Sequence, residues 1–459
     1  MALHIVILAA GQGKRMVSRL PKVLHSLAGT PMAVRVLNTA RTLNPAQIHL
    51  IYGHEGKQLQ QALPDADIHW VKQAEQLGTG HAVAQVLPFL PADADVLILS
   101  ADVPLISAAT LKTLVQTLEH YPDTAALSLL VASLPDPAGL GRIVRDESGA
   151  ICAIVEEKDA CEQVRLINEI YSGICCTKAA YLHQWLPCLS HNNAQKEYYL
   201  TEIIQIAAKA NIPICSHATH TPFEIQGVNT RVQLEALERL WQHEQAQQLM
   251  LQGVSIIDKK RIDLRGELCC GQDVFIDVNC IFEGQVVLGD NCRIGPNCVL
   301  KDVVLEADCH ILANSVLEGC RVGQRSQVGP FARLRPGTSL GRECKIGNFV
   351  ETKQAIFGNQ SKASHLSYLG DVHMGEQVNI GAGTITCNYD GVQKHQTIIE
   401  QGAFIGSDTQ LVAPVTIGAY ATIGAGSTIR KDAPAHALTL TTQVQKTHAS
   451  WQRPVKDKA

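Results

Sequence analysis

Short apolar runs alternate with amphipathic stretches through the first half of the chain. Five runs rich in Ile, Val and Leu have the length of buried strands, at residues 5–10, 48–52, 96–100, 125–131 and 151–155. Between them, stretches such as 32–41 and 108–120 place apolar residues at helical spacing. This alternation predicts an α/β domain with a Rossmann-like, mostly parallel sheet that helices cover on both faces. Ligands of such sheets bind beyond the carboxyl ends of the strands.

Residues 229–250 have a different pattern. Val232, Leu234, Leu237, Leu240 and Trp241 recur at helical spacing in a stretch without Gly or Pro. We expect one long linker helix here, between a first domain of residues 1–228 and a second domain of residues 251–459.

From about residue 264 the apolar period becomes six. The repeating positions are Ile276, Phe282, Leu288, Ile294 and Leu300, then Leu305, Ile311 and Leu317, then Val322, Val328, Leu334, Leu340 and Ile346, and finally Ile399, Ile405, Leu411, Ile417, Ile423 and Ile429. A six-residue period is typical of a parallel β-helix, in which three repeats form a triangular coil. The recurrent side chains would fill a narrow axis with no room for a large aromatic ring. Polar and glycine-rich segments interrupt the period between about 348 and 398, and we expect them to leave the coil as loops.

The composition narrows the function classes. The 459 residues include 39 Lys plus Arg and 43 Asp plus Glu, a formal charge of −4 that disfavours a general nucleic-acid binder. No apolar run approaches the roughly 18 residues of a membrane helix, and the apolar first ten residues lack the basic start and cleavage site of a signal peptide. We therefore expect a cytoplasmic protein without membrane insertion. The 15 cysteines include no CxxC pair, and we interpret the nine between 269 and 387 as small apolar fillers of the β-helix.

The segment LAAGQGKRM (8–16) directly follows the first predicted strand. Gly11 and Gly13 allow a sharp turn with amide groups at the strand end, and Lys14, Arg15 and Lys22 add three positive charges. Together they form a cradle suited to phosphate groups. The segment lacks the third glycine of the dinucleotide fingerprint and the GK[ST] of a P-loop, so neither of those sites is predicted.

Further motifs make this pattern specific. In the first half they are LPKVL (20–24), QAEQLGTGHA (73–82), DVPL (102–105), GRIV (141–144), VEEKD (155–159), EYYLT (197–201) and GVN (227–229). In the second half they are RLRPG (333–337), NFVETK (348–353), HLSYLG (365–370), NIGAGTITCNYDG (379–391) and GSD (406–408). With these motifs the chain resembles the sugar-nucleotide pyrophosphorylases essentially end to end. The resemblance is closest to the bifunctional bacterial members, which join such a domain to a left-handed β-helix acetyltransferase.

The resemblance implies that a sugar 1-phosphate attacks the α-phosphorus of UTP and releases pyrophosphate. Since the nucleophile is already an anion, the task is to align two polyanions and neutralise their charge, a catalytic role for Arg15 and Lys22. Asp102 and Asn229 would hold one Mg²⁺, which prefers oxygen ligands. The resemblance assigns the UTP and UDP-N-acetylglucosamine contacts to Leu8, Ala9, Ala10, Gly11, Lys22, Gln73, Gly78, Thr79, Ser100, Ala101, Asp102, Gly141, Glu156, Tyr171, Thr201 and Asn229. Within this set Gln73, Gly78 and Thr79 would read uracil, and Gly141, Glu156 and Thr201 would hold the sugar.

Two positions depart from the family pattern. Ser100 and Ala101 stand where Tyr-Gly commonly precedes the aspartate, and Tyr171 stands where an Asn commonly contacts the sugar. We expect Asp102 to keep its role, and a backbone or hydroxyl contact from Tyr171 to replace that of the Asn.

A second group of candidates lies in the predicted β-helix. Acetyl transfer to an amine needs a base for the ammonium proton, and histidine suits this role because its pKa lies near neutral pH. His365 has hydroxyl and amide neighbours in a polar segment, and the resemblance makes it the general base. The resemblance also assigns glucosamine-1-phosphate to Arg335, Lys353, Tyr368 and Asn379, and acetyl-CoA to Ala382, Asn388, Tyr389, Ser407, Ala425 and Thr442.

The end of the chain carries a third departure. Thr442 stands where the family pattern has an Arg that contacts CoA, so we expect weaker or rearranged recognition there and not loss of activity. Lys446 or Arg453 could supply the charge instead. The resemblance further implies a homotrimer with acyl groups bound between subunits. The tail 451–456 could reach a neighbouring subunit or fray.

Taken together, the resemblance implies a bifunctional enzyme. Its β-helix would acetylate glucosamine-1-phosphate with acetyl-CoA, and its first domain would transfer UMP from UTP to N-acetylglucosamine-1-phosphate. Two alternatives stay open: a pyrophosphorylase for another sugar phosphate with a regulatory or trimerising β-helix, and a non-enzymic nucleotide-sensing scaffold. The presence of His365 with Lys353 and Arg335 argues against the first alternative.

Overall fold

The computed structural model describes residues 2–11, 13–53, 56–63, 67–120, 127–442 and 444–453. Its contacts divide the chain into two compact units, Met1–Trp241 and Gln242–Ala459. The first two residues of the predicted strand 125–131 and the last three of the tail 451–456 lie outside the described residues. None of the described helices is long and apolar enough to cross a membrane.

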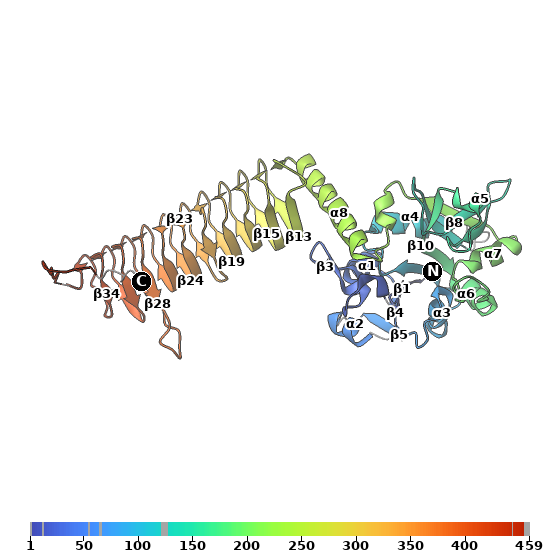
Figure 1. Cartoon of the computed structure of the whole chain (residues 1–459), viewed down its shortest axis with the longest axis horizontal. Coiled ribbons are helices and arrows are strands. Elements are labelled where there is room, and N and C mark those ends of the chain that lie inside the picture. The colour runs from blue at the N-terminus through green and yellow to red at the C-terminus, as the bar shows by residue number, and fades with distance from the viewer. Residues whose placement is uncertain are drawn as a thin grey trace, which may run out of the picture. The chain divides into compact units, whose positions relative to one another are not determined.

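One sheet forms the centre of the first unit (Figure 1). Its strands, in spatial order, are β11 (Ile214–Ala218), β7 (Leu127–Ser133), β10 (Glu169–Lys178), β6 (Asp95–Ser100), β1 (Leu3–Leu8), β4 (Gln47–Tyr52) and β5 (Ile68–Lys72). All neighbours are parallel except at β10, which runs antiparallel to β6 and β7. The mostly parallel sheet is thus confirmed.

The predicted strand 151–155 has a different place from the one expected. It is β9 (Ile151–Val155), and it forms an antiparallel hairpin with β8 (Arg142–Arg145), which touches β10. Only five residues separate β8 from β9, which is too short for the crossover that parallel neighbours need. A short antiparallel pair, β2 (Ser26–Leu27) and β3 (Thr30–Pro31), lies outside the main sheet.

Helices cover both faces of the sheet, as predicted. On one face α1, α2 and α4 pack on Ile5 and Ile7, and on the other α3, α6 and α7 pack on Val6. Neighbouring residues of a strand point to opposite faces, so this alternation buries β1 on both sides. The helices are α1 (Met32–Arg41), α2 (Gly56–Ala62), α3 (Thr79–Ala84), α4 (Ala108–Glu119), α5 (Glu162–Arg165), α6 (Ala179–Trp185) and α7 (Glu202–Lys209), with 3₁₀ turns at Lys14–Met16, Lys22–Leu24, Leu87–Phe89, Leu186–Cys188 and Pro222–Ile225.

Helix α8 (Arg231–Leu251) lies where the linker helix is predicted. It starts at a capping box: Gln233 N donates to Thr230 Oγ1 at 3.1 Å, and Gln233 Oε1 accepts from Thr230 N at 3.1 Å and from Asn229 N at 2.8 Å. The cap places Asn229 just before the helix, which leaves its carboxamide available to the first unit.

The second unit is a parallel β-helix of stacked coils (Figure 1). Its first sheet contains β12 (Ser255–Ile256), β14 (Phe275–Ile276), β16 (Arg293–Ile294), β18 (His310–Ile311), β20 (Gln327–Val328), β23 (Lys345–Asn348), β25 (Lys362–His365), β27 (Asn379–Ile380), β30 (Phe404–Ile405), β33 (Thr422–Ile423) and β35 (Leu438–Thr439). Its second contains β13 (Ile262–Cys270), β15 (Cys280–Leu288), β17 (Val299–Leu305), β19 (Val316–Val322), β21 (Arg333–Leu334), β22 (Ser339–Leu340), β24 (Glu351–Phe357), β26 (Tyr368–Met374), β28 (Ile385–Cys387), β29 (Thr397–Ile399), β31 (Gln410–Val412), β32 (Val415–Ile417) and β34 (Thr428–Ile429). All the residues predicted at six-residue positions are buried, at 3 % exposure or less.

Two expectations about the coil were wrong. Phe282 and Phe357 are both 2 % exposed, so the interior accepts aromatic rings. The coils also continue through most of 348–398, where Thr352, Ser361 and Ser367 are buried and hide the apolar period from the sequence. The large insertion is a single loop between β28 and β29, closed by a bridge between Tyr389 and Lys394 and visible beside β28 in Figure 1.

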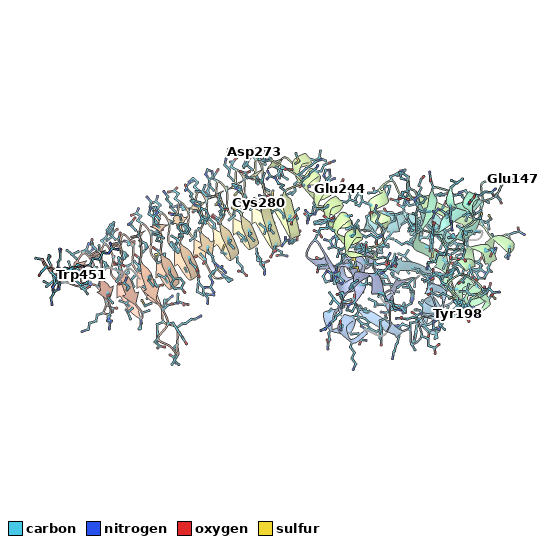
Figure 2. All side chains as sticks on the ribbon, in the orientation of Figure 1. Glu147, Tyr198, Glu244, Asp273, Cys280 and Trp451 are labelled. Atoms are coloured by element: carbon cyan, nitrogen blue, oxygen red, sulfur yellow. The ribbon has the colours of Figure 1, made fainter. Side chains whose placement is uncertain are left out.

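The cysteines only partly fill the coil interior. Cys280, labelled in Figure 2, is fully buried, and so in effect are Cys292, Cys298, Cys309, Cys320 and Cys344. The interpretation was wrong for Cys269, which is exposed, and holds only in part for Cys270 and Cys387, which are half-buried. All 15 thiols are free.

Candidate active sites

A cavity of about 530 Å³ opens at the carboxyl ends of β1, β5 and β6, where a doubly covered sheet is expected to bind ligands. Ten of the predicted nucleotide contacts line it: Leu8, Ala9, Ala10, Gly11, Lys22, Gln73, Gly78, Thr79, Ser100 and Asp102. Ala101 is fully buried behind it. The sheet thus gathers residues from four separate motifs at one edge.

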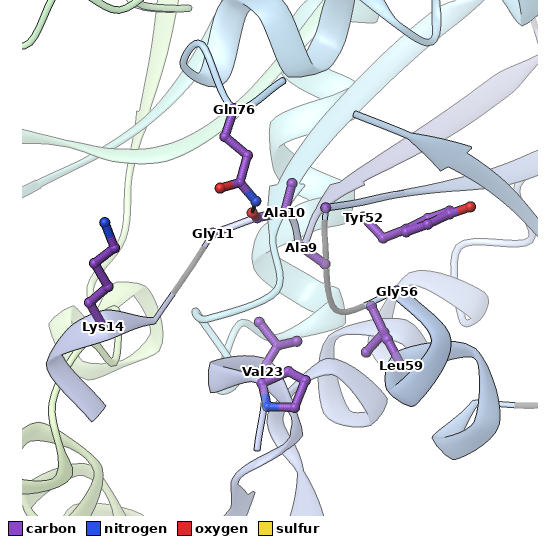
Figure 3. A pocket seen from close by; sticks show the side chains of 11 residues that line it. Ala9, Ala10, Gly11, Lys14, Val23, Tyr52, Gly56, Leu59 and Gln76 are labelled. Carbon is purple, nitrogen blue, oxygen red and sulfur yellow. Dashed lines mark hydrogen bonds between the residues drawn. The ribbon is translucent and has the colours of Figure 1, made fainter. Parts of the chain in front are cut away.

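A smaller cavity of about 290 Å³ adjoins the first and shares Ala9, Ala10, Gly11 and Lys14 with it (Figure 3). Gln76 lies between the two, and its Nε2 donates to Ala10 O at 2.6 Å. Gln76 therefore holds the glycine segment in place. Gln76 stands in the motif 73–82, but the sequence alone indicates no role for it.

The phosphate cradle predicted from the glycine segment forms a distinct hollow of about 320 Å³. It is lined by Gly11, Gly13, Lys14, Arg15, Lys22 and Asn229. Gly13 has a φ of 58°, and a Cβ there would lie 2.7 Å from Lys22 Cβ, so the turn needs glycine. Three cations around this hollow favour a polyanion.

Lys22 joins the two residues predicted to hold Mg²⁺. Its Nζ contacts Asp102 Oδ2 and donates to Asn229 Oδ1 at 3.0 Å, while Ser100 Oγ donates to Asp102 Oδ1 at 2.7 Å. Val228 N donates to Asp102 O at 2.9 Å, which brings the chain before α8 to the end of β6. One carboxylate and one carboxamide oxygen thus face the same cation, a donor set that suits Mg²⁺. No larger cluster of His, Cys, Asp or Glu suited to a metal ion occurs in the described part of the chain.

The predicted uracil contacts lie in a loop fixed from two sides. Gln73 Nε2 donates to Gly78 O at 3.1 Å, and Leu200 N donates to Thr79 Oγ1 at 3.0 Å. Gly78 has a φ of 110°, and a Cβ there would lie 2.6 Å from Tyr198 O. This loop therefore needs a glycine and has little freedom to move.

The residues predicted to contact the sugar come together beside the large cavity. Thr201 Oγ1 donates to Glu156 Oε1 at 3.2 Å, and burial raises the pKa of Glu156, an effect that Thr201 opposes. A Cβ on Gly141 would lie 3.6 Å from Glu156 Oε2. Tyr171 N donates to Gly141 O at 2.9 Å, whereas its ring packs in the core at 8 % exposure. Burial raises the pKa of Tyr171 well above its ordinary value.

The structure adds two residues to this region that the sequence analysis missed. Burial raises the pKa of Tyr199 to about 12, and its buried hydroxyl has no hydrogen-bond partner among the residues that the structure describes. Arg142 is 2 % exposed; its Nη2 donates to Glu157 Oε2 at 2.7 Å, and its Nη1 contacts Leu140 O. Arg142 thereby clamps the loop that carries Gly141. Both residues stand in the motifs quoted above. Only the burial of the Tyr199 hydroxyl and of the Arg142 side chain marks them as candidates for a role in this site.

In the β-helix, His365 is held by the coil before it. His365 Nδ1 lies 2.7 Å from Asn348 Oδ1, in register between β23 and β25. A carboxamide oxygen can only accept, so in the neutral ring Nδ1 carries the proton and the lone pair lies on Nε2. His365 is exposed, and Nε2 is therefore available as a base. Asn348 stands in the motif 348–353, but the sequence alone indicates no role for it.

A group of cations lies on the face of the β-helix next to the one that carries His365. Lys394, on the inserted loop, contacts Lys353 and lowers its pKa, and the charge of Arg335 acts in the same direction. Glu351 Oε1 accepts from Arg335 Nη1 at 2.8 Å. Three like charges held together favour an anionic group such as a phosphate. Lys394 was missed because it lies in the insertion, outside the repeat.

The predicted acetyl-CoA contacts form a column along the coils. Asp408 N donates to Ala382 O at 2.7 Å, and Gly426 N donates to Ser407 O at 2.8 Å, so Ala382, Ser407 and Ala425 occupy equivalent positions in successive coils. In the coil before Ala382, the equivalent position is that of His365. Coils repeat about every 4.8 Å, so the column runs roughly 14 Å from the histidine.

The remaining predicted residues lie around this column. Tyr389 is exposed on the inserted loop, and Asn388 Nδ2 contacts Asp371 Oδ2. Tyr368 Oη and Asn388 Nδ2 approach the same bare Gly370. Asn379 lies on β27, in register with Lys362, and no hydrogen bond links it to the Lys353 group within the described ranges. Thr442 is exposed near the last coil.

Comparisons with known proteins identify the family of the chain. Family models match a MobA-like NTP transferase domain at residues 5–147, a GMPPB C-terminal domain at 264–364 and bacterial transferase hexapeptide repeats at 396–431. "Bifunctional protein GlmU" of Legionella pneumophila (strain Lens) is 62 % identical over 457 residues, 99 % of both chains. The proteins of that name from Marinobacter nauticus and Nitrosospira multiformis are 53 % and 52 % identical over 99 % of this chain and 99 % and 98 % of their own. A solved UDP-glucose pyrophosphorylase complexed with UDP-glucose aligns with 52 % of this chain and 98 % of its own at 14 % identity and a TM-score of 0.44.

Proposed function

Because the chain belongs to the family of bifunctional GlmU proteins, we propose that it makes UDP-N-acetylglucosamine in two steps at two separate sites. The β-helix transfers acetyl from acetyl-CoA to glucosamine-1-phosphate. The sheet unit then transfers UMP from UTP to N-acetylglucosamine-1-phosphate. The observation that carries this proposal is identity of 62 % over 99 % of both chains.

For uridylyl transfer, the large cavity and the phosphate cradle bind different parts of the substrates. Gln73, Gly78 and Thr79 bind uracil, and Arg15 and Lys22 neutralise the triphosphate above Gly11. Gly141, Glu156 and Thr201 bind the N-acetylated sugar, whose phosphate oxygen attacks the α-phosphorus in line. The residues act by alignment and charge neutralisation, since a phosphate needs no general base.

Asp102 and Asn229 are the residues that would hold Mg²⁺. Their oxygens already share one cationic partner, Lys22 Nζ, so the donor set fits a divalent cation. The bound ion would neutralise charge on the reacting phosphates.

For acetyl transfer, His365 Nε2 takes the proton of the substrate ammonium group, and the amine attacks the thioester carbonyl. Asn348 fixes the imidazole and stabilises the protonated ring. Arg335, Lys353 and Lys394 bind the sugar phosphate, with Tyr368 and Asn379 around the sugar. The column Ala382, Ser407 and Ala425 binds the extended acetyl-CoA, with Asn388 and Tyr389 beside it and Thr442 at its far end.

We also propose a homotrimer in which a neighbouring copy covers the acetyl-transfer site. Phe331, Phe349 and Leu366 form an exposed apolar ridge next to His365 and Asn348, at 49 %, 56 % and 60 % exposure. Apolar side chains so exposed in a row are typical of an interface. Light scattering of the purified chain tests this proposal, and a monomer at micromolar concentration would contradict it.

The location and the division of labour complete the proposal. Fifteen free thiols fit a reducing compartment, which favours the cytoplasm. Residues 1–228 would carry uridylyl transfer, 229–250 would link the domains, and 251–459 would carry acetyl transfer.

Two assays on one preparation test the two-site proposal. Acetyl-CoA with glucosamine-1-phosphate should release free CoA, and UTP with N-acetylglucosamine-1-phosphate should release pyrophosphate. If no CoA is released while pyrophosphate is, the β-helix has only a trimerising or regulatory role. If glucose-1-phosphate replaces N-acetylglucosamine-1-phosphate without loss of rate, the sugar assignment is wrong.

A further inference from the structure

The contact between Lys22 and the two candidate metal ligands has a consequence for the order of binding. Lys22 Nζ contacts Asp102 Oδ2 and Asn229 Oδ1, and the side chains of Lys22 and Asp102 are only 11 % and 18 % exposed. The oxygens that suit a metal ion are therefore already occupied by an ammonium group. The other oxygen of Asp102 is engaged by Ser100 Oγ.

We propose that Lys22 is a place-holding cation: without a bound metal ion it occupies the metal position, and it is displaced when metal and nucleotide arrive together. This inference rests on the proposed function, because it takes Asp102 and Asn229 as the metal ligands. It adds that Lys22 has two positions with different roles, one on the ligands and one on the phosphates.

Electrostatics makes the two occupants mutually exclusive. An ammonium group and a divalent ion cannot share Asp102 Oδ2 and Asn229 Oδ1, because the two cations would lie within about 4 Å of each other, where their repulsion is strong at low exposure. Metal binding to the free enzyme must therefore first break both contacts of Lys22. The free enzyme is expected to bind a divalent ion weakly.

The structure also provides the second position. Lys22 lines both the large cavity and the phosphate cradle, where Gly11, Gly13 and Arg15 surround it. A triphosphate in the cradle attracts the ammonium group away from Asp102, and the ligands are then free for the metal. Metal and nucleotide should consequently raise each other's affinity by the same factor.

Lys14 offers a matched control. It lines the same cavity and cradle and carries the same charge, but no hydrogen bond or ion pair joins it to Asp102 or Asn229 among the described residues. Removing Lys14 thus lowers the local positive charge without freeing the two oxygens. A difference in metal affinity between the Lys22 and Lys14 variants is therefore due to the contact of Lys22 with these two oxygens.

The experiment titrates the full-length protein with Mn²⁺ alone, without nucleotide, and measures free Mn²⁺ by electron paramagnetic resonance. Lys22→Met should bind Mn²⁺ at least about tenfold more tightly than the wild type, and Lys14→Met should bind it within about twofold of the wild type. Equal affinities of Lys22→Met and Lys14→Met, including no binding by either, would overturn the place-holder role. Acetyl transfer by each variant checks that the chain is folded.

A second variant separates this inference from the metal assignment on which it rests. Adding Asp102→Ala to Lys22→Met should abolish the tight Mn²⁺ binding. If the double variant still binds Mn²⁺ tightly, Asp102 is not a ligand and both the inference and the metal assignment are wrong. If only the gain in Lys22→Met is missing while Asp102→Ala still weakens Mn²⁺ binding in the wild-type background, the assignment stands and the place-holder role is wrong.

Discussion

The two candidate sites are assembled in opposite ways. In the sheet unit, Lys22 contacts residues 80 and 207 positions away, which meet because parallel strands end at one edge. In the β-helix, His365 contacts Asn348 only 17 positions away, and the column of predicted acetyl-CoA contacts takes one residue from each successive coil. A sheet concentrates distant residues at a point, whereas a solenoid lays nearby residues out along a line.

This difference suits the two ligands. A nucleotide triphosphate is compact and highly charged, and the first site would surround it with a cradle and two adjoining cavities. Acetyl-CoA is long, and an open column of small residues matches its length better than a cavity does. Since each site is built within its own unit, damage to one should spare the other.

The sharpest test of this independence is His365→Ala. Loss of the general base should reduce acetyl transfer by roughly 10²- to 10⁴-fold. Uridylyl transfer should stay unchanged, because the described residues proposed for that site all lie in the first unit. His310→Ala, an exposed histidine on β18, is the matched control and should affect neither rate. Loss of both activities in a folded protein would contradict two separate sites.

Asp102→Ala is the converse test. It removes the carboxylate of the candidate metal pair, and uridylyl transfer should fall by at least about 100-fold, as expected when charge neutralisation at a phosphate is lost. Acetyl transfer, measured as CoA release from the same sample, should stay within twofold of the wild type. A parallel fall in acetyl transfer would mean that the units depend on each other.

Asn348→Ala tests how the coil orients the base. The bond to His365 Nδ1 strengthens as the ring becomes charged, so its loss should lower the kcat for acetyl transfer by roughly 10- to 100-fold with little change in KM. Asn297→Ala removes a similar coil-to-coil bond, to Asn314 Oδ1 at 3.1 Å, far from the histidine in sequence. If both variants lose activity equally, Asn348 only supports the coil.

Arg142→Met tests the clamp on the sugar loop and should have the smallest effect. Without its bonds to Leu140 O and Glu157, the segment before Gly141 should loosen, and the KM for N-acetylglucosamine-1-phosphate should rise about 3- to 10-fold while that for UTP stays constant. Arg145→Met on the same strand removes an ion pair to Glu169 that is about one-third exposed and should change neither value. A rise in both KM values would indicate general damage to the domain.

Much of the fold is predictable because both units repeat a simple pattern. Ile5, Val6 and Ile7 mark a strand buried on both faces, and the six-residue positions mark the coil interior without exception. The errors arose where one residue type can replace another: buried Thr352 and Ser361 hide the period, and Phe357, outside the predicted repeat positions, fits inside the coil where no aromatic ring was expected. The strand 151–155 was misplaced because its pairing depends on a short connection and not on its own sequence.

The sequence by itself determined the two architectures, the motifs and the family, because local periodicity and motif spacing are properties of the chain alone. Only the tertiary structure decided which members of the motifs meet. It joined Lys22 to Asp102 and Asn229, gave Asn348 to His365, and buried Arg142 behind Gly141. These relations depend on side-chain distances and burial, which arise when strands and coils pack and which no spacing along the chain records.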